Sequence, residues 1–397
     1  MSTVSPLALF GGQPLFERPL TTGQLANRDP ERFFELASAS LERRRLTNQG
    51  PLVDELEQRL CELHGTRHCV AFANACFAII LALRNLARPN ARKVILPSLT
   101  FRGLPHLIRW AGYEPQFCDV DPLTHTLAPG ELARLIDADT AAVLAVENIN
   151  GLCDIDALER LTLDAGIPLL VDAVYGIGGR YTDTLRDNRV GARGNASVFS
   201  LHATKLINGF EGGYLTTDDD ELAAQLQRQR SFGFGDAAIP VELGMNAKLN
   251  ELHAAMALSN LDHMHAIIND NKRRFACYQR HFQDLSWLSF ADYSQSPGTY
   301  GLVLLKVGTH APYSRDELIR ILRAENALVR PYYSPPLHQL EPGSPALPVT
   351  ESISRQYIQM PVGDLLVEAD IERLAQLFKR LEQDAVLLGT PLESVPQ

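Results

Sequence analysis

Residues 141–172 read AAVLAVENINGLCDIDALERLTLDAGIPLLVD. Ala141–Val146 and Pro168–Asp172 are short apolar runs that end at polar residues, and they predict two buried strands. Between them, Ile155–Asp164 has the apolar spacing of an amphipathic helix. Two nearly all-apolar strands joined by a helix are typical of a parallel sheet that is covered on both faces.

The same alternation extends in both directions along the chain. Toward the N-terminus, the pattern predicts helices over Val53–His64, Cys76–Leu86, Leu104–Trp110 and Pro129–Ile136, and strands over Cys69–Phe72, Lys93–Leu96 and Pro115–Val120. Toward the C-terminus, it predicts strands over Ala196–Ser200 and Gly213–Thr217, which could be antiparallel, and helices over Asp219–Gln229, Asn250–Asp270 and Asn271–Phe282.

The last third of the chain predicts a second, smaller unit. Strands are expected over Tyr300–Val307 and Leu328–Tyr333, helices over Arg315–Ala324 and Glu368–Leu387, and a long loop over Ser334–Pro348. We therefore predict an α/β protein with two domains. Residues 1–260 form a large domain with a mainly parallel sheet and an N-terminal arm, and residues 261–397 form a smaller C-terminal α/β domain.

Composition excludes several classes of protein. With 45% hydrophobic and 21% charged residues, the chain falls outside the class that stays disordered. A net charge of −10 disfavours nucleic acid as a partner, and no apolar run reaches the roughly 20 residues that span a membrane. Met1–Gly12 has no basic residue before its apolar patch and is not typical of a secretory signal. The predicted compartment is the cytoplasm.

A lysine segment follows one of the predicted strands. Ser200–Lys205 reads SLHATK, comes directly after the apolar run Ala196–Phe199 and precedes a glycine-rich turn. Ligands of open α/β sheets bind at the carboxyl ends of strands, which is where this lysine would lie. Burial there would make Lys205 a nucleophile toward carbonyl carbons, whereas an exposed lysine in a polar loop is the alternative.

Asp172 ends the strand Pro168–Asp172 and would lie at the same edge of the sheet as Lys205. Helix capping is the alternative role for an aspartate in this position. Together, the two residues match what pyridoxal phosphate requires. A lysine forms a Schiff base with the cofactor, and an aspartate keeps its pyridine nitrogen protonated so that the ring accepts electrons.

Three further features would complete a cofactor site. Asn74, Ala75 and Cys76 lie between a strand and the helix that follows, and the N–H groups at a helix N-terminus favour a phosphate. Ser200 could add a hydroxyl. Phe101 could stack on the pyridine ring, although a place in the core is the alternative for an aromatic residue.

These residues, in this order, resemble the DegT/StrS family of sugar aminotransferases, from about Asn48 to Leu387. The family consists of pyridoxal phosphate enzymes with the aspartate-aminotransferase-like fold, fold type I. A family segment of the form Ser-x-His-x-Thr-Lys, followed by Glu-Gly-Gly, contains the Schiff-base lysine. The resemblance therefore implies this role for Lys205, the ring-nitrogen role for Asp172, a phosphate contact for Ser200 and ring stacking for Phe101.

The segment from Gly244 to Ala255, GMNAKLNELHAA, resembles the part of the family whose asparagine reaches the phosphate in a partner subunit. It implies a homodimer in which Asn246 crosses the interface. His202 and His338 are candidates for substrate contacts, with structural roles as the alternative. No metal site is expected.

The chain departs from the family at three places. Asn74-Ala75-Cys76 stands where Ser-Gly-Thr is usual, and Tyr175 stands where a glutamine usually touches the ring. Glu147-Asn148-Ile149-Asn150 replaces the usual His-Leu-Tyr-Gly, which is expected to alter one wall of the site.

The resemblance implies a transaminase that takes an amino group from an amino acid, with L-glutamate expected, and adds it to the keto group of a nucleotide-linked deoxysugar. Two alternatives stay open. One is an aminotransferase for a non-sugar or cyclitol ketone of specialised metabolism, and the other is a non-catalytic regulator that binds pyridoxal phosphate. A sugar dehydratase is disfavoured, because the family dehydratases have histidine at the position of Lys205.

Overall fold

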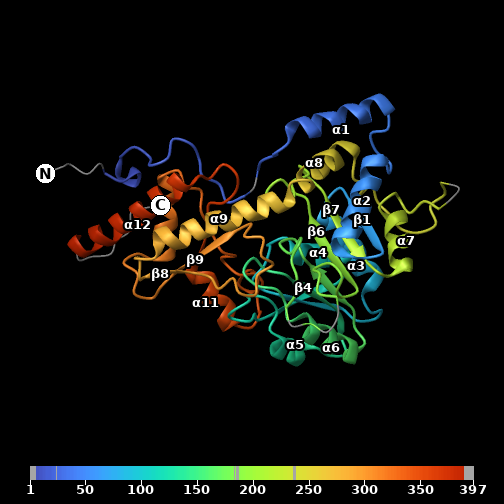
Figure 1. Cartoon of the computed structure of the whole chain (residues 1–397). Coiled ribbons are helices and arrows are strands. Elements are labelled where there is room, and N and C mark those ends of the chain that lie inside the picture. Colours follow the sequence, from blue (N-terminus) through green and yellow to red (C-terminus); the bar gives the residue numbers. More distant parts are fainter. Residues whose placement is uncertain (1–5, 24, 183, 185–186, 236–237, 389–397) are drawn as a thin grey trace.

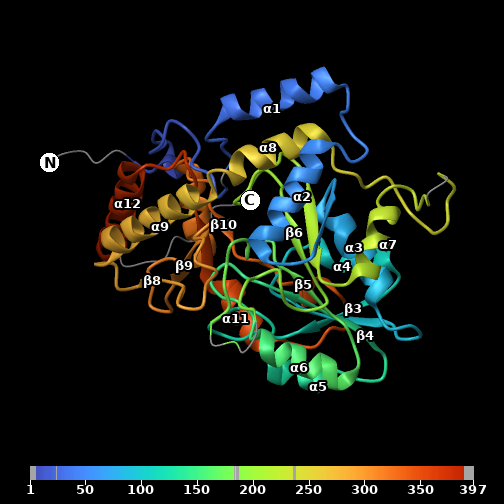
Figure 2. The ribbon, with the colours of Figure 1, turned by 45° about the vertical axis from the view of Figure 1, so that its right-hand side comes forward.

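The computed structural model of the chain describes residues 6–23, 25–182, 184, 187–235 and 238–388 (Figure 1). The first five residues of Met1–Gly12, the segment considered above as a signal, lie outside this description. A second view shows the large domain with helices on both sides of its sheet (Figure 2). None of the described helices is both long and apolar enough to cross a bilayer.

The large sheet has seven strands in the order β1-β7-β6-β5-β4-β2-β3. In the chain they are β1 (His68–Phe72), β2 (Lys93–Pro97), β3 (Glu114–Cys118), β4 (Thr140–Val146), β5 (Leu169–Asp172), β6 (Ala196–Ser200) and β7 (Gly213–Thr217). β7 is antiparallel to β1 and β6, and the other neighbouring pairs are parallel. The predicted mainly parallel sheet is thereby confirmed.

Alternate residues of each strand enter separate cores on the two faces of the sheet. In β4, for example, Val143 and Ala145 pack on one face, and Ala142 and Leu144 pack on the other. The first face is covered by α2 (Pro51–His64), α5 (Pro129–Leu135), α6 (Ile155–Ala165) and α8 (Glu251–Leu261), and the second by α3 (Ala75–Leu86), α4 (Leu104–Ala111) and α7 (Asp220–Gln229). Burial on both faces explains why these strands are apolar throughout.

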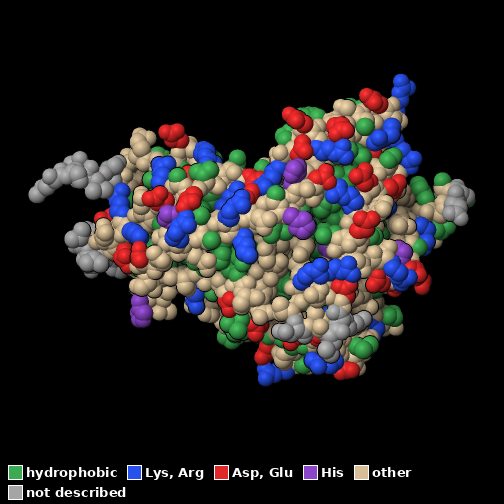
Figure 3. Space-filling model, viewed as in Figure 1, with side chains coloured by type: hydrophobic (Ala, Val, Ile, Leu, Met, Phe, Trp, Pro, Cys, Tyr) green, Lys and Arg blue, Asp and Glu red, His purple; other side chains and the backbone are tan. Residues whose placement is uncertain are grey.

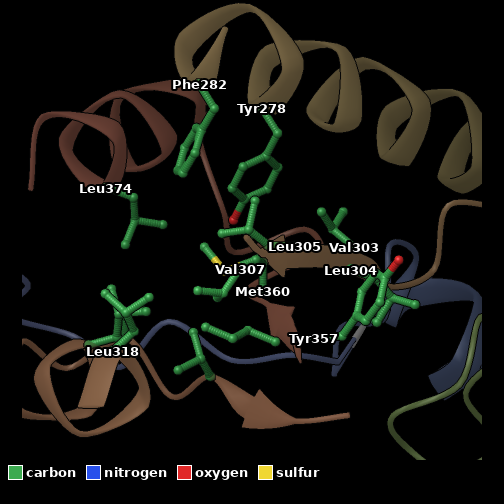
Figure 4. Close-up of a cluster of buried hydrophobic side chains, with 14 of the residues drawn as sticks. Tyr278, Phe282, Val303, Leu304, Leu305, Val307, Leu318, Tyr357, Met360 and Leu374 are labelled. Carbon is green, nitrogen blue, oxygen red and sulfur yellow. The ribbon is translucent and has the colours of Figure 1, made fainter. Parts of the chain in front are cut away.

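The small domain contains a four-stranded antiparallel sheet, in the order β10-β11-β9-β8. Its strands are β8 (Leu288–Phe290), β9 (Val303–Val307), β10 (Arg330–Pro331) and β11 (Tyr357–Met360), and its helices are α9 (Met264–Phe282), α10 (Arg315–Ala324), α11 (Pro348–Gln356) and α12 (Glu368–Leu388). Side chains from α9, α10 and α12 meet those of β9 and β11 in one core (Figure 4).

The N-terminal segment also packs into this small-domain core. Leu7, Phe16 and Leu20 are buried among its side chains. The Glu325 carboxylate accepts hydrogen bonds from the backbone amides of Ala8 at 2.8 Å and Leu15 at 2.7 Å. The segment includes the 3₁₀ helix Ala8–Phe10. In Figure 1 it lies beside α12, before the chain crosses to α1 (Pro30–Arg43).

The chain passes from the large domain to the small one through α8 and α9. The two predicted helices, Asn250–Asp270 and Asn271–Phe282, are wrong in their boundary, because the break lies at Asp262–His263. α8 packs on α1 and α2, whereas the far half of α9 packs on α12, so the helix must change direction between the two cores. A boundary between domains near residue 260 stays a proposal.

The region after β10 differs most from the sequence prediction. The first half of the predicted long loop contains the 3₁₀ helix Leu337–Leu340, and α11 begins at Pro348, where the loop was expected to end. β8 and β11 were not predicted. On the face of the molecule shown in Figure 3, acidic and basic side chains are interspersed over both domains.

Candidate active site

The candidate site lies at the carboxyl ends of β5 and β6. Leu170 and Val198 belong to the core on the α3 side of the sheet. Because side chains alternate along a strand, Asp172 and Ser200, two residues further on, are directed to the same side. Asp172 is only 3% exposed, and its Oδ1 accepts a hydrogen bond from the Val174 amide at 3.2 Å.

The Asp172 carboxyl is held in an environment that disfavours its charge. Its pKa is raised to about 6, because burial outweighs the hydrogen bond from Val174 and the attraction of Lys205. Lys205 is thus close enough to Asp172 to act on it electrostatically. A second cation beside this carboxylate would relieve the cost of burying its charge.

Lys205 lies against an aromatic ring. Its Nζ is 3.9 Å from the centroid of the Tyr175 ring, which is a cation–π contact. The Lys205 backbone amide donates to the carbonyl of His202 at 2.9 Å, in the turn that follows β6. The structure therefore brings together three residues predicted from the sequence: Lys205, Asp172 and Tyr175.

The N-terminus of α3 lies beside this group. Asn74 caps the helix, and its side chain accepts a hydrogen bond from the Cys76 amide at 2.8 Å. Asp172 is one of the neighbours that raise the pKa of the Cys76 thiol, although burial is the larger cause. A Cβ at Gly213 would lie 2.4 Å from the Ala75 nitrogen, so the start of β7 requires glycine where it passes this helix. The second glycine of the Glu-Gly-Gly motif therefore has a structural reason.

β7 also joins the two parts of the predicted phosphate cradle, which are the turn Asn74–Cys76 and Ser200. Gly213 pairs with Phe72 of β1 on one side and with Ser200 of β6 on the other. The side chain of Ser200 accepts a hydrogen bond from the His202 amide at 3.2 Å. Ser200 and the turn that begins at Asn74 are far apart in the sequence, but they lie on the two sides of Gly213.

Glu211 links two of the predicted residues at the rim of the site. Its carboxylate accepts a hydrogen bond from Asn74 Nδ2 at 3.2 Å and lies 3.7 Å from His202 Nε2. His202 is half-exposed, and its Nδ1 is 2.9 Å from the Thr204 hydroxyl oxygen. Within the described ranges, no three His, Cys, Asp or Glu side chains gather in a way that could hold a metal ion.

Three predicted residues lie apart from this group. In the part of the chain that the structure describes, Phe101, Asn246 and His338 form no hydrogen bond, ion pair or ring contact with Lys205, Asp172 or Tyr175. Phe101 is 58% exposed, with its ring over Gly103. Asn246 is exposed and forms a backbone bridge with Ser231.

His338 is buried, and both of its ring nitrogens have partners within the protein. Nδ1 is 2.7 Å from the Ser98 hydroxyl oxygen at the end of β2, and Nε2 is 3.2 Å from a Glu351 carboxylate oxygen of α11. This geometry favours the structural alternative for His338, in which it joins the small domain to the large sheet.

The segment Glu147–Asn150, which differs from the usual family sequence, lies inside the protein. All four side chains are buried. Glu147 accepts hydrogen bonds from the Tyr181 hydroxyl at 2.5 Å and the Cys153 amide at 2.7 Å. The side-chain amides of Asn148 and Asn150 donate to backbone carbonyls of the turn at residues 123–125. These contacts fasten the neighbouring loops to the end of β4. The expectation that Glu147–Asn150 alter one wall of the site stays a prediction.

Glu147→Gln is expected to change how the stability of the cofactor-free protein depends on pH. Burial raises the pKa of Glu147 to about 7, so its favourable contribution is complete at acidic pH and is lost as the pH rises through 7. Glutamine carries no charge. Relative to the parent, the variant should therefore gain about 3 kcal/mol in free energy of unfolding between pH 4.5 and pH 8.

Urea unfolding of both proteins across this pH range measures the difference. The buried histidines titrate in both proteins, so their contributions cancel in the comparison. The repulsion between Asp172 and Glu147 is a minor cause of the raised pKa of Glu147, and it is part of the difference that is measured. Glu211→Gln, at a half-exposed carboxylate, is the control and should leave the profile unchanged. If the free energies of unfolding of the parent and of Glu147→Gln change with pH in the same way, the pKa of Glu147 is not raised by folding.

Sequence reasoning missed Tyr333, which lies next to the group around Lys205. Burial, Tyr175, Tyr332 and Asp172 raise the pKa of Tyr333 well above its usual value. The residue belongs to the small domain, so its position depends on how the two domains pack. The only signal in the sequence is its place in Tyr332–His338, YYSPPLH, whose last four residues also resemble the family.

The fold and this arrangement define a class of protein. Solved structures with this fold are aminotransferases of fold type I. The crystal structure of DesI in the presence of its TDP-sugar product is 36% identical and has a TM-score of 0.89, with the match covering 96% of this chain and 98% of that one. S. venezuelae DesV, solved in complex with a ketimine intermediate, is 25% identical with a TM-score of 0.82, over 92% and 99% of the two chains.

The chain belongs to the DegT/DnrJ/EryC1/StrS aminotransferase family, whose model matches residues 27–379. A curated relative, the dTDP-4-amino-4,6-dideoxy-D-glucose transaminase of Shigella dysenteriae, is 28% identical over 320 residues, which are 80% of this chain and 86% of the relative. The resemblance found in the sequence, the fold type and the assignment as an aminotransferase are thereby confirmed.

Proposed function

We propose that this enzyme binds pyridoxal phosphate and transfers an amino group from L-glutamate to the keto group of a nucleotide-linked deoxysugar. The observation that carries the proposal is the buried carboxyl of Asp172 beside Lys205, at the carboxyl edge of the sheet. Family membership supports the aminotransferase reaction.

The residues present fit pyridoxal phosphate. Asp172 is a buried carboxylate whose charge needs a further cation, which a protonated pyridine nitrogen would supply. Lys205 offers an amine for the aldehyde. Ser200 and the N-terminus of α3, with Ala75 and Cys76, would hold the phosphate. The Asn74 side chain already accepts a hydrogen bond from the Cys76 amide, so a phosphate bound at that amide would have to displace the Asn74 side chain.

The other predicted residues have roles around this centre. Tyr175 lies at the usual position of the ring-touching glutamine, and its contact with Lys205 supports a place beside the cofactor. Phe101 would stack on the ring by moving from its exposed position. His202 is half-exposed at the rim and is the better candidate of the two histidines for a substrate contact.

When bound, pyridoxal phosphate supplies an aldehyde that captures amines and a ring that accepts electrons from the carbon next to the captured nitrogen. Lys205 would hold the cofactor in the resting enzyme. Once the donor amine has displaced it, the Lys205 amine would take a proton from the donor α-carbon and, as an acid, give it to the former aldehyde carbon on the other side of the captured nitrogen. Asp172 would keep the proton on the ring nitrogen. Tyr175 keeps the Lys205 amine close to the site while it is free.

The acceptor is inferred from relatives. The relatives from Shigella dysenteriae and Escherichia coli are named as transaminases of dTDP-4-amino-4,6-dideoxy-D-glucose, and DesI was solved with its TDP-sugar product. The 36% identity to DesI over nearly the whole chain favours a dTDP-linked deoxysugar over a cyclitol or other ketone. Lys205 and Asp172 are both present, which favours an enzyme over a non-catalytic regulator.

A homodimer is part of the proposal. Leu243 is 72% exposed and Trp110 is 76% exposed, and both line an apolar hollow of about 490 Å³ that also includes Cys76 and Phe77. Exposed apolar surface of this kind marks an interface. Because it adjoins Asn246 and the phosphate cradle, a second copy seated there would bring its Asn246 toward this chain's site. A cytoplasmic location stays a prediction.

Turnover with defined substrates tests the proposal. The purified protein, loaded with pyridoxal phosphate, is mixed with L-glutamate and a dTDP-linked 4-keto-6-deoxysugar, and the aminated sugar is measured by mass spectrometry. We expect product that depends on both substrates and on Lys205. Amination of a cyclitol ketone but of no nucleotide sugar would support the first alternative. Lysine-dependent binding of the cofactor without any amino transfer would support the regulator.

A further inference from the structure

The segment Ser98–Arg102 leads from β2 to α4 and carries Phe101. Its first residue is fixed to the sheet, because the Ser98 amide donates a hydrogen bond to the Cys118 carbonyl of β3 at 3.2 Å. The Phe101 ring is 58% exposed and lies over Gly103. The backbone of this segment therefore determines which positions the Phe101 ring can reach.

Leu337 and His338, at the start of the 3₁₀ helix in the small domain, bind Ser98 through three hydrogen bonds. The Leu337 amide donates to the Ser98 carbonyl at 3.1 Å, and the His338 amide donates to the Ser98 hydroxyl oxygen at 3.0 Å. This hydroxyl oxygen also lies 2.7 Å from His338 Nδ1. Because the oxygen accepts from the amide, its own hydrogen is free to be donated to Nδ1. Ser98 is 0% exposed and His338 is 4% exposed, so water does not compete for these contacts.

The other side of the imidazole has a partner that is itself held in place. With Nδ1 accepting from Ser98, the ring proton is on Nε2, which donates to Glu351 Oε1 of α11 at 3.2 Å. The first turn of α11 is bound to the residue that follows β3, because the Asp119 carboxylate accepts from the Thr350 amide at 2.8 Å and from the Thr350 hydroxyl at 2.7 Å. The imidazole of His338 thus spans two points that are fixed to the large sheet.

The far end of the segment is bound to the same part of the small domain. The Arg102 guanidinium donates to the Ser334 carbonyl, and Arg109 of α4 pairs with Glu341 through two hydrogen bonds of 3.0 and 2.9 Å. Contacts to the small domain therefore lie on both sides of Phe101. A backbone that is held on both sides leaves mainly the side-chain torsions of Phe101 free to change. This reduces the entropy that is lost when the ring is placed against a ligand.

We propose that His338 is a positioning residue, which holds the Ser98–Arg102 segment so that Phe101 can stack on the ring of pyridoxal phosphate. The inference rests on the proposed role of Phe101 in cofactor binding. His338 acts through its hydrogen bonds to Ser98 and not through a contact of its own with the cofactor. The small domain thereby contributes to the affinity for a cofactor that the large domain binds.

His338→Asn and His338→Leu test the proposal as a matched pair. The two new side chains have the same branched shape, but only asparagine offers an oxygen near the position of Nδ1 to accept from the Ser98 hydroxyl. Both variants lose the hydrogen bond to Glu351, so this loss cancels in the comparison. Hydrogen–deuterium exchange of residues 99–103 is measured by mass spectrometry in the cofactor-free proteins. We expect several-fold faster exchange in His338→Leu and a rate close to that of the parent in His338→Asn.

Ser98→Ala removes the hydroxyl on the other side of the contact and should give the same faster exchange at residues 99–103. Its control is Ser197→Ala in β6, an equally buried serine whose hydroxyl donates to the Arg193 carbonyl at 3.2 Å, and this control should exchange there at the parental rate. Parental exchange in His338→Leu or in Ser98→Ala would overturn the proposal, and so would equal exchange in His338→Asn and His338→Leu. If neither variant of His338 folds, Ser98→Ala decides the outcome alone.

The affinity for the cofactor shows whether Phe101 carries the effect. His338→Leu should raise the Kd for pyridoxal phosphate several-fold, measured by absorbance titration, whereas His338→Asn should stay close to the parent. In a Phe101→Leu background, His338→Leu should have no further effect, because His338 acts only through the position of that ring. Additive effects on Kd would overturn the proposal. If His338→Leu does not fold, Ser98→Ala takes its place in this cycle.

The two experiments separate this proposal from the proposed function. Failure of the parent protein to bind pyridoxal phosphate would refute the proposed function. The exchange experiment contains no cofactor, so it decides independently whether His338 holds the Ser98–Arg102 segment.

Discussion

An alanine at position 205 is expected to lower kcat for amino transfer by about 10⁴-fold or more, because one amine serves both as the covalent anchor and as the acid–base group. The Lys205 amine lies over Tyr175 and close to Asp172, and we expect no other lysine to replace it. The lysine-dependent visible absorbance of the bound cofactor should disappear in the same variant. Stopped-flow spectra with L-glutamate and steady-state turnover measure the two effects.

Lys248→Ala is the matched control for this experiment. Lys248 also forms a cation–π contact, with its Nζ 4.7 Å from the Phe232 ring centroid, but it lies outside the group around Asp172. Its replacement should leave the absorbance band in place. Turnover by Lys205→Ala within tenfold of the parent would refute the assignment of the catalytic lysine.

Asp172→Asn is expected to lower kcat by about 10²- to 10³-fold, the range seen when one preorganised electrostatic contact is removed from an active site. Asparagine can still accept the hydrogen bond from Val174, so the loop geometry is kept while the charge is lost. Without that charge the pyridine nitrogen loses its proton, and the ring withdraws electrons less strongly. Steady-state kinetics with saturating L-glutamate measures the loss.

The cofactor-free Asp172→Asn protein should show the opposite effect on stability. The pKa of Asp172 is raised to about 6, so its contribution to stability is lost as the pH rises through 6. The variant should therefore unfold at higher urea concentration than the parent at pH 8. Glu147→Gln is the control for catalysis, because its carboxyl faces Tyr181 and Cys153, and its kcat should stay within about threefold of the parent. Equal kcat values for Asp172→Asn and Glu147→Gln would contradict the ring-nitrogen role.

The large domain could be predicted from the sequence because its signals are local. Ala141–Val146, Ile155–Asp164 and Pro168–Asp172 match β4, α6 and β5 to within one residue at each end. Burial on both faces makes each strand apolar, and the polar residue that ends the run lies at the carboxyl edge. The positions of Asp172 and Lys205 follow from that rule together with the family motif.

The parts that were missed depend on contacts between distant segments. β8 has three residues and β11 has four, so neither carries a clear pattern, and both form strands because β9 offers each of them a partner. β10 is only two residues of the predicted strand Leu328–Tyr333, and it pairs with β11. The end of α8 at Leu261 is set by the packing of two domains rather than by a helix-breaking residue. Tyr333 approaches Tyr175 only once the small domain is in place. Local patterns cannot report such contacts.

The place of the N-terminal segment in the small-domain core has a consequence for the order of events during synthesis. Ala8 and Glu325 are 317 positions apart, which corresponds to roughly 15–60 s of translation. The large domain has all of its strands by Thr217 and can begin to fold earlier. Until the segment around Glu325 has been synthesised, the side chains of Leu7, Phe16 and Leu20 have no core to pack into and stay exposed. Chaperones that bind apolar segments of nascent chains would therefore be needed for longest at the N-terminal segment.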